Sequence, residues 1–136
     1  MIKHKIITID TKGNCDIINI TELVEKEVEN SKIKDGICTI FVKGSTAAIS
    51  TIEYEEGLLK DFKNFMDKIL PKGNYEHNKA WNDENGHSHL RSTLLKTSLQ
   101  VPIINGKLFL GTWQQIVLID FDTRPRRREI AISIYS

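Results

Sequence analysis

Three features of the sequence predict a compact α+β domain built mostly from antiparallel β-sheets. Short β-branched runs recur along the chain, a few segments carry apolar residues at helical spacing, and the last strands follow one another through turns. Strands joined by turns are typical of antiparallel pairing. The length of 136 residues suits one hydrophobic core, so we expect a single domain over 1–136. The patterns predict about seven strands and about three helices.

The first third of the chain predicts a strand pair followed by a helix. The stretch from Lys3 to Ile9 is rich in isoleucine, and the Gly13-Asn14 turn separates it from an extended run over 15–18. From Ile20 to Asn30, apolar residues then recur at helical spacing, which predicts the first helix.

The middle of the chain predicts two strands and a second helix. Residues 37–42 form a β-branched run too short for a helix, and residues 49–54 alternate in the manner of a strand. Between Leu58 and Ile69 the apolar residues mark an amphipathic helix that ends before Pro71.

The second half begins with an irregular loop over 72–85, where apolar residues are scarce. Leucines at helical spacing over 89–99 predict the third helix, and Asn105-Gly106 predicts a hairpin turn between neighbouring strands. Residues 111–121 and 129–135 complete the predicted strands.

Composition argues against several classes of protein. The formal net charge of +1 gives no general attraction to nucleic acid or to an anionic membrane, and no stretch has the length of apolar chain that a membrane span requires. The N-terminus lacks the pattern of a signal peptide, so we expect a cytoplasmic protein. Cys15 and Cys38 lack the spacing of metal ligands, and we expect both to be reduced thiols.

Three of the four histidines, His77, His87 and His89, fall within the polar segment before and at the start of the third helix. Imidazole nitrogens bind Zn²⁺ and similar ions, and Asp83 could add an oxygen ligand or orient a ring. The segment therefore predicts a site for a divalent metal ion, Zn²⁺ or Mg²⁺. A solvated loop with surface histidines explains the same spacing and stays open as the alternative.

Other segments could bind the phosphate of a small molecule. The predicted helix N-terminus would offer free N–H groups with Arg91 close by, and Arg127 belongs to an arginine run that could clamp a phosphate. Plain capping of the helix by Asn85 or Ser88, and a solvated arginine turn, are the alternatives.

Five motifs in this order resemble those of the YjbQ-like family. They are Ser45-Thr46-Ala47-Ala48, Asn74-Tyr75-Glu76-His77, Asn85-Gly86-His87-Ser88-His89-Leu90-Arg91-Ser92, Leu99-Gln100-Val101-Pro102 and Gly111-Thr112-Trp113-Gln114. The resemblance extends over nearly the whole chain. It implies a compact α+β fold, a homotrimer and an activity like that of secondary thiamine-phosphate synthases, which join a pyrimidine pyrophosphate to a thiazole phosphate and release pyrophosphate.

The resemblance and the local patterns together define the predicted site residues. The predicted catalytic residues are His89, Asp83, Thr46 and Gln114. The residues predicted to hold the phosphorylated substrate are Arg91, Ser92, Thr112 and Arg127. Ser45 departs from the family pattern, because a histidine commonly stands there. A non-enzymatic trimer that binds a metal or a metabolite in the same pocket is the alternative function.

Overall fold

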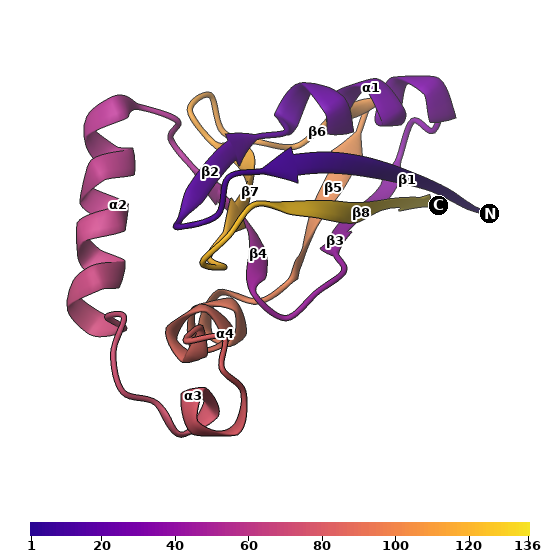
Figure 1. Ribbon diagram of the computed structural model, residues 1–136. Helices are drawn as coiled ribbons and strands as arrows, with labels where there is room; N and C mark the ends of the chain where they lie inside the picture. The colour runs from indigo at the N-terminus through magenta and orange to yellow at the C-terminus, as the bar shows by residue number, and fades with distance from the viewer.

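The computed structural model describes residues 1–136 and contains eight strands and four helices (Figure 1). The strands are β1 (Ile2–Thr11), β2 (Asp16–Asn19), β3 (Gly36–Val42), β4 (Ala47–Ile52), β5 (Ser98–Ile104), β6 (Lys107–Leu108), β7 (Gln115–Asp120) and β8 (Arg126–Tyr135). The helices are α1 (Thr21–Ser31), α2 (Glu56–Ile69), α3 (Glu76–Ala80) and α4 (Gly86–Leu95).

The strands form two antiparallel sheets, which confirms the predicted α+β class. The larger sheet has the order β1-β8-β3-β5-β6 and the smaller has the order β2-β7-β4. Every strand pair is antiparallel. One core lies between α1 and the sheets and centres on residues such as Ile40 and Ile130, while a second packs α2 against the smaller sheet through Met66 and Phe121. Figure 1 shows α1 above the sheets, α2 at one side and α4 below them.

The helices differ from the prediction in number and in bounds. The segment over 72–85 contains the short helix α3, which the sequence did not predict because five residues are too few to display a helical period. Helix α4 begins at Gly86 and ends at Leu95, so the predicted range of 89–99 was wrong at both ends. Residues from Ser98 onward belong to β5 instead.

Two expectations from composition can be checked directly. Cys15 and Cys38 are both free and buried, as expected for reduced thiols. Burial raises the pKa of Cys15 to about 11 and that of Cys38 to about 12. No helix of the structure has the length and apolar character that crossing a membrane requires.

Helix α4 is fixed against the sheet by two buried serines. The hydroxyl of Ser88 donates to the carbonyl oxygen of Phe121, and the hydroxyl of Ser92 donates to the carbonyl oxygen of Ala47. Both serines are buried, and they lie four residues apart on one face of the helix. Their small side chains let the helix approach the ends of β4 and β7, where the polar residues of the candidate site gather.

Candidate functional site

The structure brings together two of the predicted histidines, His77 on α3 and His89 on α4. Their ring centroids are 4.3 Å apart and the ring planes are tilted by 59°. Burial lowers the pKa of His89 and the neighbouring His77 lowers it further, although Asp122 and Asp83 oppose the shift. His89 is therefore neutral at pH 7, and one of its ring nitrogens can accept a proton or bind a metal ion.

His87 does not join this pair. Two residues along a helix correspond to a rotation of roughly 200°, so His87 and His89 leave α4 on different faces. His87 is buried, its Nδ1 atom has no hydrogen-bond partner, and burial followed by the charges of Arg91 and Lys72 lowers its pKa. No group of three His, Cys, Asp or Glu side chains converges into a metal site in the chain. The predicted metal site of His77, His87 and His89 is thus not assembled.

An open groove of about 470 Å³ lies beside His89. We call it the hydroxyl groove, because serine and threonine side chains make up most of its lining. It is lined by Gly44, Ser45, His89, Ser92, Thr93, Lys96, Thr97 and Ser98. The lining contains a lysine, an imidazole and five side-chain hydroxyls but no carboxylate and no hydrophobic residue. Such a surface is suited to an anion that accepts several hydrogen bonds.

A buried ion pair lies behind the groove, at the ends of β7 and β8. Asp120 accepts hydrogen bonds from Nε and Nη2 of Arg128, at 2.7 and 2.8 Å, and from the hydroxyl of Thr11 at 2.6 Å. The Nη1 atom of Arg128 lies 2.7 Å from the point that a Cβ on Gly44 would occupy. The guanidinium therefore lies against the backbone that lines the groove, where only glycine leaves room for it.

Thr46 connects this ion pair to a second buried carboxylate, Asp122. The Thr46 hydroxyl accepts from Arg128 Nη2 at 2.6 Å and donates to Asp122 Oδ2 at 3.0 Å. Asp122 also accepts from Nε of Arg126 at 2.8 Å and from the side-chain amide of Asn85 at 3.2 Å. We call these residues, with Asp120, the buried ion-pair network. This network occupies the hydroxyl of Thr46, which is buried and does not line the hydroxyl groove.

The acidity of Asp122 gives a testable pH dependence. Burial alone raises the pKa of Asp122, but hydrogen bonds from the Thr123 backbone, Asn85, Thr46 and Arg126 outweigh it and lower the pKa from 3.8 to about 2. This decrease corresponds to roughly 2.5 kcal/mol of folding free energy. Because the folded-state pKa is the lower one, the stabilisation is fully present above about pH 4 and is lost as the pH falls toward 2.

We therefore expect Asp122→Asn to lower the free energy of unfolding by about 2 kcal/mol at pH 7 and by much less at pH 2.5. Urea unfolding of both proteins across this pH range measures the difference. Asp16→Asn, which changes a partly exposed carboxylate that accepts one hydrogen bond from the Lys12 backbone, is the control. A difference between wild type and Asp122→Asn that stays constant from pH 7 to pH 2.5 would contradict the assignment.

The buried ion-pair network was not predicted, although the sequence contains a periodic signal for it. Ile130, Ile132 and Ile134 are buried at alternate positions of β8, and the same period continued backward places Arg128 and Arg126 on the inner face. The predicted Arg127 instead points outward, with 76% of its side chain exposed, and pairs with Asp10 at 3.1 Å.

Arg91 has a structural role that was not predicted. Its side chain is 5% exposed, its Nε donates to the carbonyl oxygen of Leu70 at 3.0 Å, and its Nη2 pairs with Asp67 at 3.1 Å. These contacts join α4 to the end of α2. Arg91 does not line the hydroxyl groove, whereas Ser92 lines it while its hydroxyl donates to the carbonyl oxygen of Ala47.

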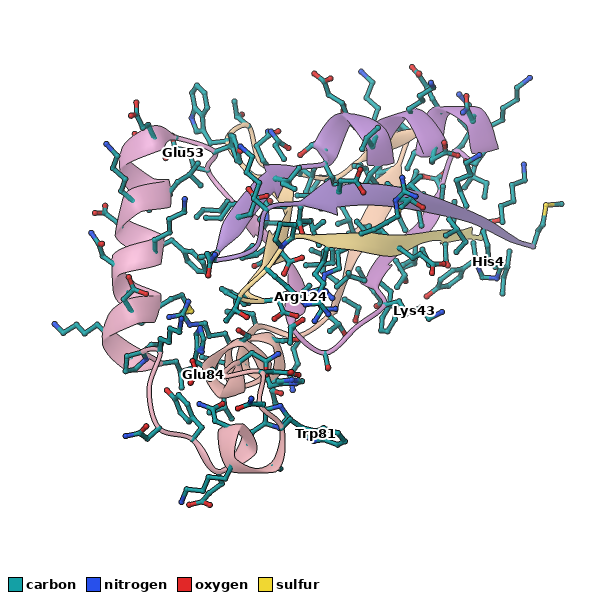
Figure 2. The ribbon with its side chains drawn as sticks, in the orientation of Figure 1. His4, Lys43, Glu53, Trp81, Glu84 and Arg124 are labelled. Carbon is teal, nitrogen blue, oxygen red and sulfur yellow. The ribbon has the colours of Figure 1, made fainter.

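The predicted residues Thr112 and Gln114 lie at the opposite end of β4 from Thr46. The side-chain amide of Gln114 donates to Thr51 Oγ1 at 3.2 Å, and its oxygen accepts from the Gly111 backbone at 3.0 Å. Thr112 lines a separate hollow with Glu53 and Trp113. Figure 2 shows Glu53 by the start of α2 and Glu84, the neighbour of Asp83, beside α4 near the other end of α2. One copy of the chain therefore does not bring all the predicted catalytic residues into one site.

The chain matches a known protein family over nearly its whole length. The model of the UPF0047 protein YjbQ-like family matches residues 5–136. The UPF0047 protein of Archaeoglobus fulgidus is 40% identical over 127 residues, which cover 93% of this chain and 96% of the relative. The UPF0047 protein of Methanothermobacter thermautotrophicus is 40% identical, with 91% and 85% covered.

Solved structures agree with this relationship. A YbjQ-like protein of unknown function from Sulfolobus solfataricus superposes with a TM-score of 0.87 at 35% identity, covering 98% of both chains. A yjbq/upf0047 family protein from Clostridium acetobutylicum gives a TM-score of 0.88 at 34% identity, with 96% and 99% covered. The family match, the identities and the superpositions together show that the chain belongs to the UPF0047 protein YjbQ-like family.

Proposed function

We propose that this protein is an enzyme that acts on a phosphorylated small molecule in the hydroxyl groove. The observation that carries the proposal is the lining of that groove, which contains Lys96, the imidazole of His89 and no carboxylate. The hydroxyls of Ser92 and Thr93 donate to backbone carbonyls, and those of Ser45, Thr97 and Ser98 remain to donate to a ligand. The formal net charge of +1 gives the chain no general attraction to phosphate. Binding of a phosphate would therefore depend on the local donors of the groove.

The family resemblance suggests which reaction to test first. In thiamine-phosphate synthesis a thiazole nitrogen bonds to the methylene carbon of the pyrimidine, and the carbon–oxygen bond to pyrophosphate breaks. The electron pair leaves with the pyrophosphate, so the protein must stabilise negative charge on the leaving group. Lys96 would pair with that charge and the groove hydroxyls would donate to its oxygens. The ring N–H of neutral His89 would donate a hydrogen bond to a departing oxygen and so stabilise its charge.

A divalent metal ion would assist the same chemistry by offsetting charge on the diphosphate. His77 and His89 would supply two imidazole ligands. Ser45 lines the groove at the position where the family commonly has a histidine. Two nitrogen ligands are fewer than catalytic zinc sites usually take from the protein. We therefore propose that such an ion binds weakly to the chain alone.

We also propose the homotrimer that the resemblance implies. Trp113 is 71% exposed and lies on the loop that carries Thr112 and Gln114. Burial of this ring between subunits would stabilise an assembly. Light scattering of wild type and of Trp113→Ala gives the mass of each protein and tests both the trimer and the place of Trp113 in it. A wild-type trimer that dissociates in Trp113→Ala supports the trimer and the interface role of Trp113. A monomeric wild type contradicts the trimer and that role.

Pyrophosphate release by tag-free protein tests the enzymatic proposal. The protein is incubated with the pyrimidine pyrophosphate and the thiazole phosphate, with and without Zn²⁺ or Mg²⁺. We expect release by wild type and a loss of about 100-fold or more in His89→Ala, because removal of one preorganised hydrogen-bond donor to the developing charge costs a factor of that order. His4→Ala is the matched control, since His4 is exposed on β1, outside the hydroxyl groove, and its ring forms a hydrogen bond with Ser133. Substrate binding without release by wild type would favour the non-enzymatic metabolite-binding function.

A further inference from the structure

The chain passes from α4 into β5 through a lysine whose backbone has a conformation typical of glycine (Figure 1). Lys96 follows the last residue of α4 and has φ 78° and ψ 159°. A Cβ atom is unfavourable in this region of φ/ψ space, and residues other than glycine occupy it only where the surrounding structure forces them to. The backbone of Lys96 is therefore strained.

This conformation differs from that of an ordinary helix end. Lys32, at the end of α1, has φ 60° and ψ 13°, which is the left-handed helical conformation in which many helices end. Asn14 and Asn105 also have positive φ, which asparagine tolerates. The ψ angle of Lys96 places it outside the left-handed helical region, so a helix cap of the usual kind does not account for it.

Hydrogen bonds on both sides of Lys96 impose the conformation. Its N–H donates to the carbonyl oxygen of Ser92 at 2.8 Å, and its own carbonyl oxygen accepts from the N–H of Ile49 at 3.3 Å. The carbonyl oxygen of Thr97 accepts from the N–H of Val42 at 2.9 Å. Because these bonds join backbone atoms only, the chain follows the same path whichever residue stands at position 96. Glycine would adopt this path without strain, so the reason for a lysine lies in its side chain.

The side chain of Lys96 is available to a ligand at the candidate site. It is exposed, it lines the hydroxyl groove, and it is the one fixed positive charge in that lining. Lys43, Lys60 and Lys79 pair with glutamates, whereas the ammonium of Lys96 has no ion-pair partner in the chain. A free ammonium beside side-chain hydroxyls can form a charge-assisted hydrogen bond with an anion.

The helix dipole does not explain a lysine at this position. A cation near the C-terminal end of a helix stabilises the helix, yet the last turn of α4 contains no basic residue. A lysine at the exposed position of Leu94 would give the same benefit on an unstrained helical backbone. The feature particular to Lys96 is its place in the lining of the hydroxyl groove.

We infer that Lys96 determines the affinity of the hydroxyl groove for anions, and that its strained backbone is retained for the sake of that affinity. This inference rests on the proposed function and names the residue on which affinity at the same site depends. Stabilising substitutions that cost function are expected where a site holds strain. Loss of the Lys96 side chain should therefore weaken anion binding while loss of its Cβ stabilises the fold.

Lys96→Gly tests both parts of the inference in the full chain, with pyrophosphate as the probe. We expect calorimetry to show pyrophosphate binding about 10-fold weaker than in wild type, the loss expected for one charge-assisted hydrogen bond. Without ligand, Tm should rise by roughly 2 to 8 °C, because the relief of strain exceeds the additional freedom that glycine gives the unfolded chain.

Three further variants separate the charge from the backbone. Lys96→Ala keeps a Cβ, so it should weaken pyrophosphate binding as much as Lys96→Gly does without the rise in Tm. Lys96→Arg keeps the positive charge and should bind pyrophosphate within about 3-fold of wild type. Lys32→Gly places glycine at the exposed end of α1, outside the groove, and should leave the affinity unchanged.

The outcomes separate this inference from the proposed function. Equal pyrophosphate affinity of wild type and Lys96→Gly would overturn the inference and leave the anion site intact. A Tm of Lys96→Gly no higher than that of Lys96→Ala would show that residue 96 stores no strain, and would also overturn it. Failure of wild type to bind pyrophosphate would overturn the proposed function and the inference with it.

Discussion

Replacement of Asp120 by asparagine is expected to destabilise the protein by about 3 to 5 kcal/mol, the usual consequence of leaving a buried charge without its partner. Asp120 is fully buried and accepts two hydrogen bonds from Arg128, whose side chain is 8% exposed. A neutral amide cannot compensate the guanidinium that remains. Urea unfolding at a fixed protein concentration measures the loss.

A matched surface pair controls for the chemistry of the substitution. Asp10 and Arg127 form the same kind of ion pair at 3.1 Å, but their side chains are 74% and 76% exposed. Asp10→Asn should therefore change the free energy of unfolding by less than about 1 kcal/mol. Combining Asp120→Asn with Arg128→Met should recover part of the loss. A loss for Asp120→Asn no larger than that for Asp10→Asn would contradict the structural role of the network.

Ser45→His is expected to raise the affinity for Zn²⁺ by roughly 10- to 100-fold, because it would place a third imidazole in the groove that already contains His89. His77 and His89 are already adjacent, with ring centroids 4.3 Å apart. Three protein ligands and one open position are the arrangement that catalytic zinc sites use. Competition against a chromophoric chelator, with tag-free protein, measures the affinity.

Two further variants show whether the gain comes from the proposed ligands. His89→Ala in the Ser45→His background should abolish the gain, since it removes the central ligand. His87→Ala should leave it intact, because His87 is buried on another face of α4. The proposed arrangement is wrong if Zn²⁺ affinity is unchanged by Ser45→His, or if the gain survives without His89.

Much of the fold could be predicted, because it depends on periodic burial. The apolar spacing between Leu58 and Ile69 corresponds to α2, and the Asn105-Gly106 signal marks the turn between β5 and β6. Helix α3 and the start of α4 were not predicted correctly. Their bounds are set by contacts distant in sequence, such as the bond from Ser88 to Phe121, which no local pattern contains.

The candidate site was predicted only in part, for a similar reason. The histidine-rich segment contains His77 and His89, and Ser92 lines the groove beside them. The spacing of the histidines did not show that His87 and His89 would leave α4 on different faces. The arginine run predicts phosphate ligands, whereas Arg128 is buried and forms an ion pair with Asp120. Asp120 ends β7 and Arg128 lies near the start of β8, and only the folded chain brings the two side chains together.

Titration of ¹⁵N-labelled protein with pyrophosphate, followed by amide chemical shifts, tests the central claim that the hydroxyl groove is the ligand site. We expect saturable shifts for Ser45, Thr93 and Lys96, which line the groove, and little change at Arg124, before β8, and at Arg127, in β8. His89→Ala should weaken the response at the groove. Saturable shifts confined to Arg124 and Arg127, or no saturable shift anywhere, would contradict the account.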